Sequence, residues 1–216
     1  MDEEKVIMCF GDSNTWGYNP ATRERFPRGV RWAGRLQNLL GDGYYVIEEG
    51  LNSRTVVWDD PVCGDKSGLK HLTMLLVSHK PLDLVIVMLG TNDCQDRFGL
   101  NGFNIARSME RVVRAVKDSE CGPDGRAPKL LLISPAHIRD NLPETWLGES
   151  MGLGSVRTSK EIAKYYKLLA EESGAYFLDA EEYVKASPTD AVHLDTEAHA
   201  KLADAVCMKI KQIFEN

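Results

Sequence analysis

The chain has 216 residues, of which 43% are hydrophobic and 27% are charged, and its formal net charge is −6. This composition is typical of a soluble globular protein with enough apolar material for one sizeable core. The negative charge argues against nucleic acid and anionic membranes as partners, and no apolar run approaches the roughly 18 residues of a membrane span.

The five cysteines are odd in number and have no C-x-x-C spacing, so we expect neither a disulfide framework nor a zinc site. The first residues are charged and show no signal-peptide pattern. No linker, repeat or low-complexity tract divides the chain. We therefore expect one domain over residues 1–216, a cytoplasmic location, and no metal or cofactor.

Five β-rich or apolar runs alternate along the chain with segments of helical periodicity. The predicted strands are residues 6–10, 44–49, 84–89, 129–133 and 175–179. The predicted helices are residues 30–40, 69–79, 104–119 and 159–173, a short one at 180–184, and a last one from 195 or 196. This alternation predicts a parallel sheet with helices on both faces, and the very apolar third strand should be central.

The segment from Ala136 to Val156 has no clear periodicity. Loops of this length in compact domains are often lids or binding loops. Its apolar side chains would be unusual in a loop that faces only solvent. We expect them to line a pocket or a subunit contact; they are Leu142, Trp146, Leu147 and Met151.

Small polar residues follow three of the predicted strands. Ser13 follows the first strand, Asn52 and Ser53 follow the second, and Asn92 follows the third. Because ligands of open α/β sheets bind at the carboxyl ends of the strands, these residues should share one edge. Asp190 and His193 come after the fifth strand, and we expect them to reach the same edge.

This set of residues fits acyl transfer. A serine hydroxyl is a weak nucleophile that needs an adjacent base, which His193 supplies, and Asp190 can orient the imidazole. The spacing of three residues lets a turn bring the carboxylate to the far ring nitrogen. The Asn92 amide and the backbone N–H groups of Ser13 and Ser53 are candidates for the oxyanion hole.

Several neighbouring residues have competing interpretations. Asp12 is interpreted as structural, bonding to its own turn. His199 lies inside the last helix and is not expected to be a second base. Arg54 fits a structural ion pair at least as well as a contact with an acidic substrate. Candidate substrate-pocket residues are Asn14, Trp16, Tyr18, Asn52 and Trp146.

The sequence resembles the SGNH (GDSL-type) hydrolases, and most of all their bacterial arylesterase/acyltransferase branch. The first block matches as Gly11-Asp12-Ser13, the third as Gly90-Thr91-Asn92-Asp93, and the fifth as Asp190-Ala191-Val192-His193-Leu194. One departure is in the second block, where Ser53 stands at the position of the family's oxyanion-hole glycine. A serine backbone N–H can still donate if its conformation is kept.

The resemblance implies a three-layer α/β/α flavodoxin-like fold with a five-stranded parallel sheet. It implies hydrolysis of short acyl esters through an acyl-serine intermediate, with acyltransferase or perhydrolase side activity. Ser13 would be the nucleophile, His193 the base, Asp190 its partner, and Asn92 with backbone N–H groups the oxyanion hole. Relatives in this branch form homo-oligomers, so a homo-oligomer is expected.

Two alternatives remain open. The family includes carbohydrate O-acetyl esterases, so the ester could be an acetylated sugar. A non-catalytic module that holds a small ligand at the sheet edge is a different class, and it does not explain Asp190 and His193. The sequence around Ser13 lacks the G-x-S-x-G elbow, which disfavours an α/β-hydrolase fold.

Overall fold

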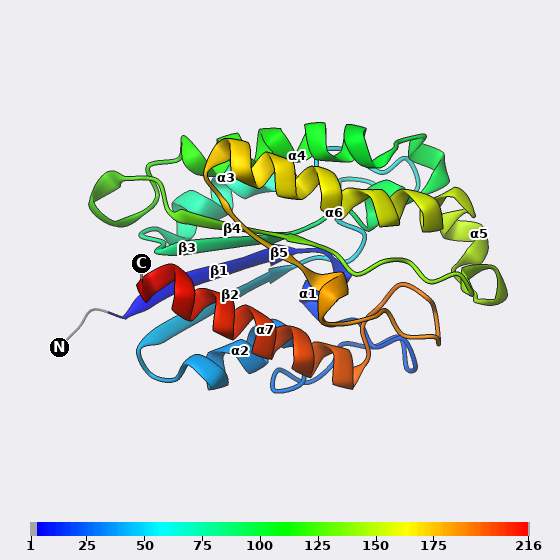
Figure 1. The fold of residues 1–216 in the computed structure, drawn as a ribbon, viewed down its shortest axis with the longest axis horizontal. Helices are drawn as coiled ribbons and strands as arrows, with labels where there is room; N and C mark the ends of the chain where they lie inside the picture. The colour runs from blue at the N-terminus through cyan, green and yellow to red at the C-terminus, as the bar shows by residue number, and fades with distance from the viewer. Residues whose placement is uncertain (1–3, 216) are drawn as a thin grey trace.

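The sheet has five parallel strands. The computed structural model of the chain describes residues 4–215. The strands are β1 (Lys5–Gly11), β2 (Tyr44–Gly50), β3 (Leu84–Met88), β4 (Lys129–Ser134) and β5 (Tyr176–Asp179). Their spatial order is β2-β1-β3-β4-β5, and every pair is parallel (Figure 1). This is the doubly wound order of flavodoxin-like sheets, so the predicted fold class is confirmed.

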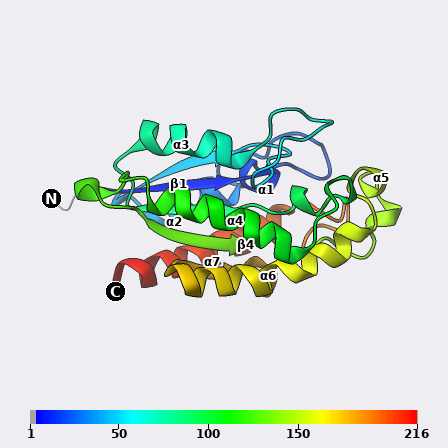
Figure 2. The same cartoon turned by 90° about the horizontal axis from the view of Figure 1, so that it is seen from above.

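Long helices cover both faces of the sheet. On one face lie α2 (Trp32–Leu40) and α7 (Thr196–Glu215), and on the other lie α3 (Gly68–His79), α4 (Gly102–Lys117) and α6 (Gly154–Ser173), as Figures 1 and 2 show. Shorter helical turns occupy the connections. They are α1 (Ser13–Trp16), η1 (Asn92–Cys94), η2 (Asp96–Phe98), η3 (Pro123–Gly125), η4 (Leu142–Glu144), α5 (Gly148–Met151) and η5 (Ala180–Glu182).

Each face of the sheet has its own apolar core. Along β1, Ile7 and Cys9 pack into the core under α2 and α7, whereas Met8 and Phe10 pack into the core under α3, α4 and α6. This alternation follows from the two-residue repeat of a strand. All five residues of β3 are buried, as expected of a central strand with helices on both sides.

The segment over residues 136–156 differs from the prediction. It contains η4 and α5, and α6 begins at Gly154 rather than near residue 159. Leu142, Leu147 and Met151 are buried in the core with α4 and α6. They fill the core, so their assignment to a pocket or a subunit contact was wrong. Trp146 alone of this set is 46% exposed.

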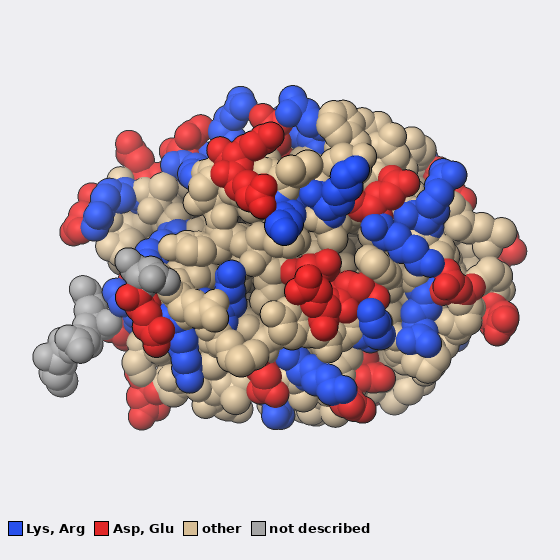
Figure 3. Space-filling model, viewed as in Figure 1, with Lys and Arg blue, Asp and Glu red and all other residues tan. Residues whose placement is uncertain are grey.

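The outer surface carries charges of both signs. Figure 3 shows acidic and basic side chains interspersed over one face of the molecule. Two helices, α6 and α7, are 20 residues long. Among residues 4–215, no helix combines the length and apolarity needed to cross a bilayer.

Candidate active site

Ser13 stands at the carboxyl end of β1, where the chain turns into α1. Asp12 caps that short helix, and its Oδ1 accepts a hydrogen bond from the Asn14 N–H at 2.9 Å, as the structural interpretation of Asp12 predicted. The last residue of β1 must be small, because a Cβ on Gly11 would lie 2.1 Å from Thr15 Oγ1 and 2.9 Å from Met88 O. Ser13 is therefore held at one fixed position on the sheet edge.

Three side chains from the two ends of the chain meet at this point. Ser13 Oγ lies 2.9 Å from His193 Nε2, and His193 Nδ1 lies 2.7 Å from Asp190 Oδ2. The Asp190 carboxylate accepts only, so Nδ1 carries the proton and Nε2 presents its lone pair to the serine hydroxyl. In this tautomer, the imidazole can take the proton from Ser13.

A tight turn brings Asp190 to its own histidine. The second carboxylate oxygen, Oδ1, accepts hydrogen bonds from the N–H groups of Val192 at 3.0 Å and His193 at 2.9 Å. Burial acts to raise the Asp190 pKa. The hydrogen bond and charge of His193, together with these backbone N–H groups, outweigh burial and hold the pKa below its usual value. Asp190 therefore stays ionised beside the imidazole.

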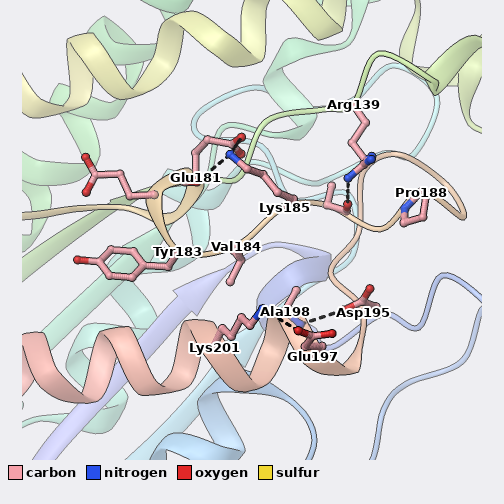
Figure 4. A pocket seen from close by; sticks show the side chains of 12 residues that line it. Arg139, Glu181, Tyr183, Val184, Lys185, Pro188, Asp195, Glu197, Ala198 and Lys201 are labelled. Atoms are coloured by element: carbon pink, nitrogen blue, oxygen red, sulfur yellow. Dashed lines mark hydrogen bonds and ion pairs between the residues drawn. The ribbon is translucent and has the colours of Figure 1, made fainter.

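The loop that carries His193 is held from both sides. On the inner side, Asn14 Oδ1 accepts from the Leu194 N–H at 2.9 Å, and Asn14 Nδ2 lies 3.4 Å from Val192 O. On the outer side, the Arg139 N–H donates to Ala191 O and its guanidinium donates to Ala186 O (Figure 4). These contacts fix the position of the imidazole on the sheet edge.

The cavity in Figure 4 lies on the outer side of this loop. Its volume is about 310 Å³, and its lining includes Arg139, Asp195 and Lys201. Ser13 and His193 do not line it, so it is separate from the Ser13–His193 pair. Within residues 4–215, no three side chains of the metal-binding types converge on a common point.

Asn92 follows the end of β3 and is the first residue of η1. Its Nδ2 donates to Arg54 O at 3.0 Å, and its Oδ1 accepts from Gln95 Nε2 at 3.2 Å. Ser53 has φ +64°, in the left-handed region that favours glycine. Among the described residues, the N–H groups of Ser13 and Ser53 have no acceptor within hydrogen-bond distance.

Each candidate oxyanion-hole residue has a buried ionisable neighbour in the sequence. Burial raises the pKa of Asp93 to about 7 and that of Asp12 to about 6. Arg54 is buried, and burial lowers its pKa to about 10. Its guanidinium donates to Gly11 O at 2.8 Å and to Glu49 O, and it lies over the Phe10 ring. Arg54 is thus structural, tying β1 to the β2 loop.

The predicted pocket residues occupy different places. Tyr18 stacks on His193 with ring centroids 4.3 Å apart, and Trp16 lies 6.5 Å from Tyr18. The Trp146 ring packs against the Arg23 guanidinium, 4.5 Å away. Asn52 has a buried Oδ1 that finds no hydrogen-bond partner within residues 4–215. Both polar atoms of the Asn14 side chain contact the loop that carries His193.

Two residues that bear on the site were not singled out from the sequence. Gln95 contacts Asn92 from three positions ahead, a spacing that a 3₁₀ turn brings together. Arg139 bonds the loop of residues 186–191, which lies about fifty residues later in the sequence. No local sequence pattern predicts this contact. For Gln95, the available signal was its position three residues after Asn92.

Comparison with known proteins gives concordant results. A sequence model of the GDSL-like lipase/acylhydrolase family matches residues 9–201. The chain is 25% identical to an acetylxylan esterase of Xylanibacter ruminicola over an alignment that covers 95% of this chain and 43% of the relative. The chain thus spans less than half the length of that curated relative.

Solved structures cover almost the whole chain. Est24, a carbohydrate acetylesterase from Sinorhizobium meliloti, is 37% identical with a TM-score of 0.91, over 97% of this chain and all of the other. An aryl esterase of M. smegmatis is 36% identical with a TM-score of 0.89, over 96% of this chain and 99% of the other. Both similarities extend from the first strand to the last helix.

Proposed function

The chain belongs to the GDSL-like lipase/acylhydrolase family, and from this premise we propose that it is a serine esterase for small acyl groups. The single observation that carries the proposal is the continuous line of hydrogen bonds from Ser13 through His193 to Asp190. The esterases among its structural relatives support the same reaction class.

The first half of the reaction transfers the acyl group to the enzyme. Ser13 Oγ attacks the ester carbonyl carbon while His193 Nε2 takes the hydroxyl proton. Asp190 keeps Nδ1 protonated and stabilises the imidazolium that forms. The tetrahedral intermediate collapses, the C–O bond of the leaving group breaks, and His193 returns the proton to the departing alcohol.

The second half releases the acid. A water molecule gives a proton to His193 Nε2 as its oxygen attacks the acyl-serine carbonyl carbon. The bond between that carbon and Ser13 Oγ then breaks, and His193 returns the proton to Oγ, which regenerates Ser13. In both halves, negative charge develops on the carbonyl oxygen. The unpaired N–H groups of Ser13 and Ser53 and the second N–H of the Asn92 amide are the proposed donors to it.

The experiment that tests the proposal is hydrolysis of p-nitrophenyl acetate by the wild type and by Ser13→Ala. We expect kcat to fall at least about 10³-fold, because the variant has no nucleophile to acylate. A fluorophosphonate probe should label Ser13 in the wild type. Near wild-type hydrolysis by the variant would contradict Ser13 as the nucleophile. A wild type that neither hydrolyses the ester nor takes the label would favour a non-catalytic binding module.

A carbohydrate O-acetyl ester is the second candidate substrate. Its support is that the carbohydrate acetylesterase Est24 and the aryl esterase are almost equally similar to this chain. A panel of acetylated sugars beside simple aryl acetates separates the two by kcat/KM. Alcohol or peroxide could accept the acyl group from Ser13 in competition with water. Product analysis in water–alcohol mixtures, and with added peroxide, tests this.

We also propose a cytoplasmic location and a homo-oligomeric state. A cytoplasmic location is supported by the free state of the five cysteines, four of them buried, and cell fractionation tests it. A homo-oligomer is supported by exposed apolar side chains such as Trp146, and light scattering gives the mass in solution. A monomer at all concentrations would contradict the second proposal.

A further inference from the structure

Gln95 is a buried amide next to the proposed oxyanion hole. It lies between η1 and η2, and only 4% of its surface is exposed. Its Nε2 lies 3.2 Å from Asn92 Oδ1. None of the sequence blocks shared with the family includes it, and the reaction described above gives it no task.

The contacts of Asn92 fix which end of each amide faces which partner. Arg54 O is a carbonyl that only accepts, so the Asn92 atom 3.0 Å from it must be the nitrogen. Asn92 Oδ1 therefore faces Gln95, and the Gln95 atom that contacts it must be a nitrogen too. This assignment follows from donor and acceptor chemistry and leaves one N–H of Asn92 for the oxyanion.

One hydrogen bond alone would leave the plane of the Asn92 amide poorly defined. The last torsion of asparagine is broad, so the group could tilt about its bond to Arg54 O. The contact from Gln95 holds the opposite end of the same amide. Two contacts at the two ends set the direction of the remaining N–H, and oxyanion stabilisation depends on that direction.

The other end of Gln95 argues against a purely structural role. Its Oε1 is buried and has no hydrogen-bond partner among the described residues. An unpaired buried acceptor lowers stability, and an apolar side chain of similar shape would avoid that loss. The amide is therefore explained better by its action on Asn92 than by its contribution to the core.

We propose that Gln95 is a positioning residue that aims the Asn92 amide N–H at the oxyanion. The proposal rests on the proposed function, because it needs Asn92 to act as an oxyanion donor. Gln95 does not contact the reacting atoms itself. Its effect should pass entirely through Asn92, which distinguishes this role from general support of the loop.

A double-mutant cycle with p-nitrophenyl acetate tests the proposal. Gln95→Met keeps the length of the side chain and removes its donors, and we expect kcat to fall about tenfold with KM unchanged. Asn92→Ala should lower kcat by about 10²- to 10³-fold. In the Asn92→Ala background, Gln95→Met should change kcat less than about twofold, because its only route of action is gone.

Gln95→Glu provides a second, size-matched variant. Its ionised carboxylate can only accept, so it repels Asn92 Oδ1 and favours a turned amide, and kcat should fall further than in Gln95→Met. Gln37→Met is the control. Gln37 bonds Tyr44 O and the Val46 N–H on the far side of the sheet, so its loss should lower Tm without changing kcat.

The outcomes separate the two claims. If Gln95→Met lowers kcat equally in both backgrounds, or changes KM instead, the positioning role is wrong while the esterase assignment stands. If Asn92→Ala keeps wild-type kcat, Asn92 is no oxyanion donor and the role of Gln95 fails with it. If the wild type hydrolyses no ester and Ser13 takes no phosphonate, the proposed function itself is wrong.

Discussion

Two buried histidines lie six residues apart and have opposite surroundings. His193 is 8% exposed and lies between a carboxylate and a serine hydroxyl. His199 is fully buried in α7, its Nδ1 accepts from the Trp32 N–H at 3.3 Å, and its Nε2 has no partner among the described residues. Burial, with the positive charges of His193 and Arg31, lowers the His199 pKa to about 3.

The difference indicates what the proposed base role of His193 depends on. An imidazole that takes a proton at neutral pH needs a fixed negative partner and an open nitrogen next to the donor. His193 has both in Asp190 and Ser13. His199 has neither, so it stays neutral and acts as a packing residue beside Phe26, whose ring it meets edge-on at 5.4 Å. The sequence-based interpretation of His199 as a helix residue agrees with this.

Removing the negative partner of His193 should have the largest effect. Asp190→Asn keeps the shape of the side chain, but its amide can donate to Nδ1 and so favours the wrong tautomer. We expect kcat to fall about 10³- to 10⁴-fold. Steady-state hydrolysis of p-nitrophenyl acetate measures it. A loss of less than about tenfold would mean that His193 does not depend on Asp190.

Loosening the His193 loop should have a smaller effect. Asn14→Ala removes the contacts to Leu194 N and Val192 O, so the imidazole loses its fixed distance to Ser13, and we expect kcat to fall about 10- to 100-fold. Asn141→Ala is the matched control, because Asn141 bonds Pro188 O on the exposed outer side of the loop. Equal losses in both variants would contradict a specific role for Asn14.

The Tyr18 ring, which stacks on His193, should contribute less to catalysis than Asn14. Tyr18→Leu removes the stacked ring, and we expect kcat/KM to fall roughly tenfold, because the imidazole gains freedom to rotate. Tyr18→Phe keeps the ring and loses only the hydroxyl, so it should stay within about threefold of the wild type. If Phe is as damaging as Leu, the hydroxyl rather than the ring is what matters at this position.

His199 should affect the pH dependence of stability and leave catalysis almost unchanged. Its folded pKa of about 3 lies below the unfolded value of 6.5, so acid favours the unfolded state. Between pH 6.5 and 5, this group alone should lower the free energy of unfolding by about 2 kcal/mol. His199→Leu should lack that loss, and urea unfolding of both proteins at several pH values measures it.

Two buried carboxyls act in the opposite direction. Burial raises the folded pKa values of Asp12 and Asp93 to about 6 and 7, above the usual aspartate value. Their contribution to stability is therefore full at low pH and is lost as the pH rises through 6 and 7. Because wild type and His199→Leu share them, the difference between the two curves isolates His199. Identical slopes would contradict a neutral, unpaired His199.

The sequence predicted the sheet and the residues on its edge because both depend on local signals. Apolar runs marked the strands, and the blocks around Ser13, Asn92 and His193 marked the strand ends. The start of α6 was missed because Ser155 and Ser159 are buried there and donate to backbone carbonyls, which hides the apolar periodicity. A helix whose buried face includes such serines does not show the regular apolar spacing from which a helix is predicted.

Long-range contacts are the part of the site that the sequence did not predict. Asn14 follows Ser13 in the sequence, but its side chain bonds a loop 180 residues away. Trp146 meets Arg23 from the other half of the chain. Such contacts appear only when the sheet brings its loops together. Gln95 was missed for a different reason: its partner Asn92 is only three residues away, and a 3₁₀ turn that no apolar pattern marks brings the two side chains together.

The most direct test of the account is the site of acylation. The wild type is mixed with p-nitrophenyl acetate, quenched in acid during turnover, digested and analysed by mass spectrometry. We expect one acetyl group on Ser13, accumulating further in Asp190→Asn if deacylation becomes slow, and none at that position in Ser13→Ala. An acetyl group on another residue, or turnover by Ser13→Ala at the wild-type rate, would contradict Ser13 as the nucleophile.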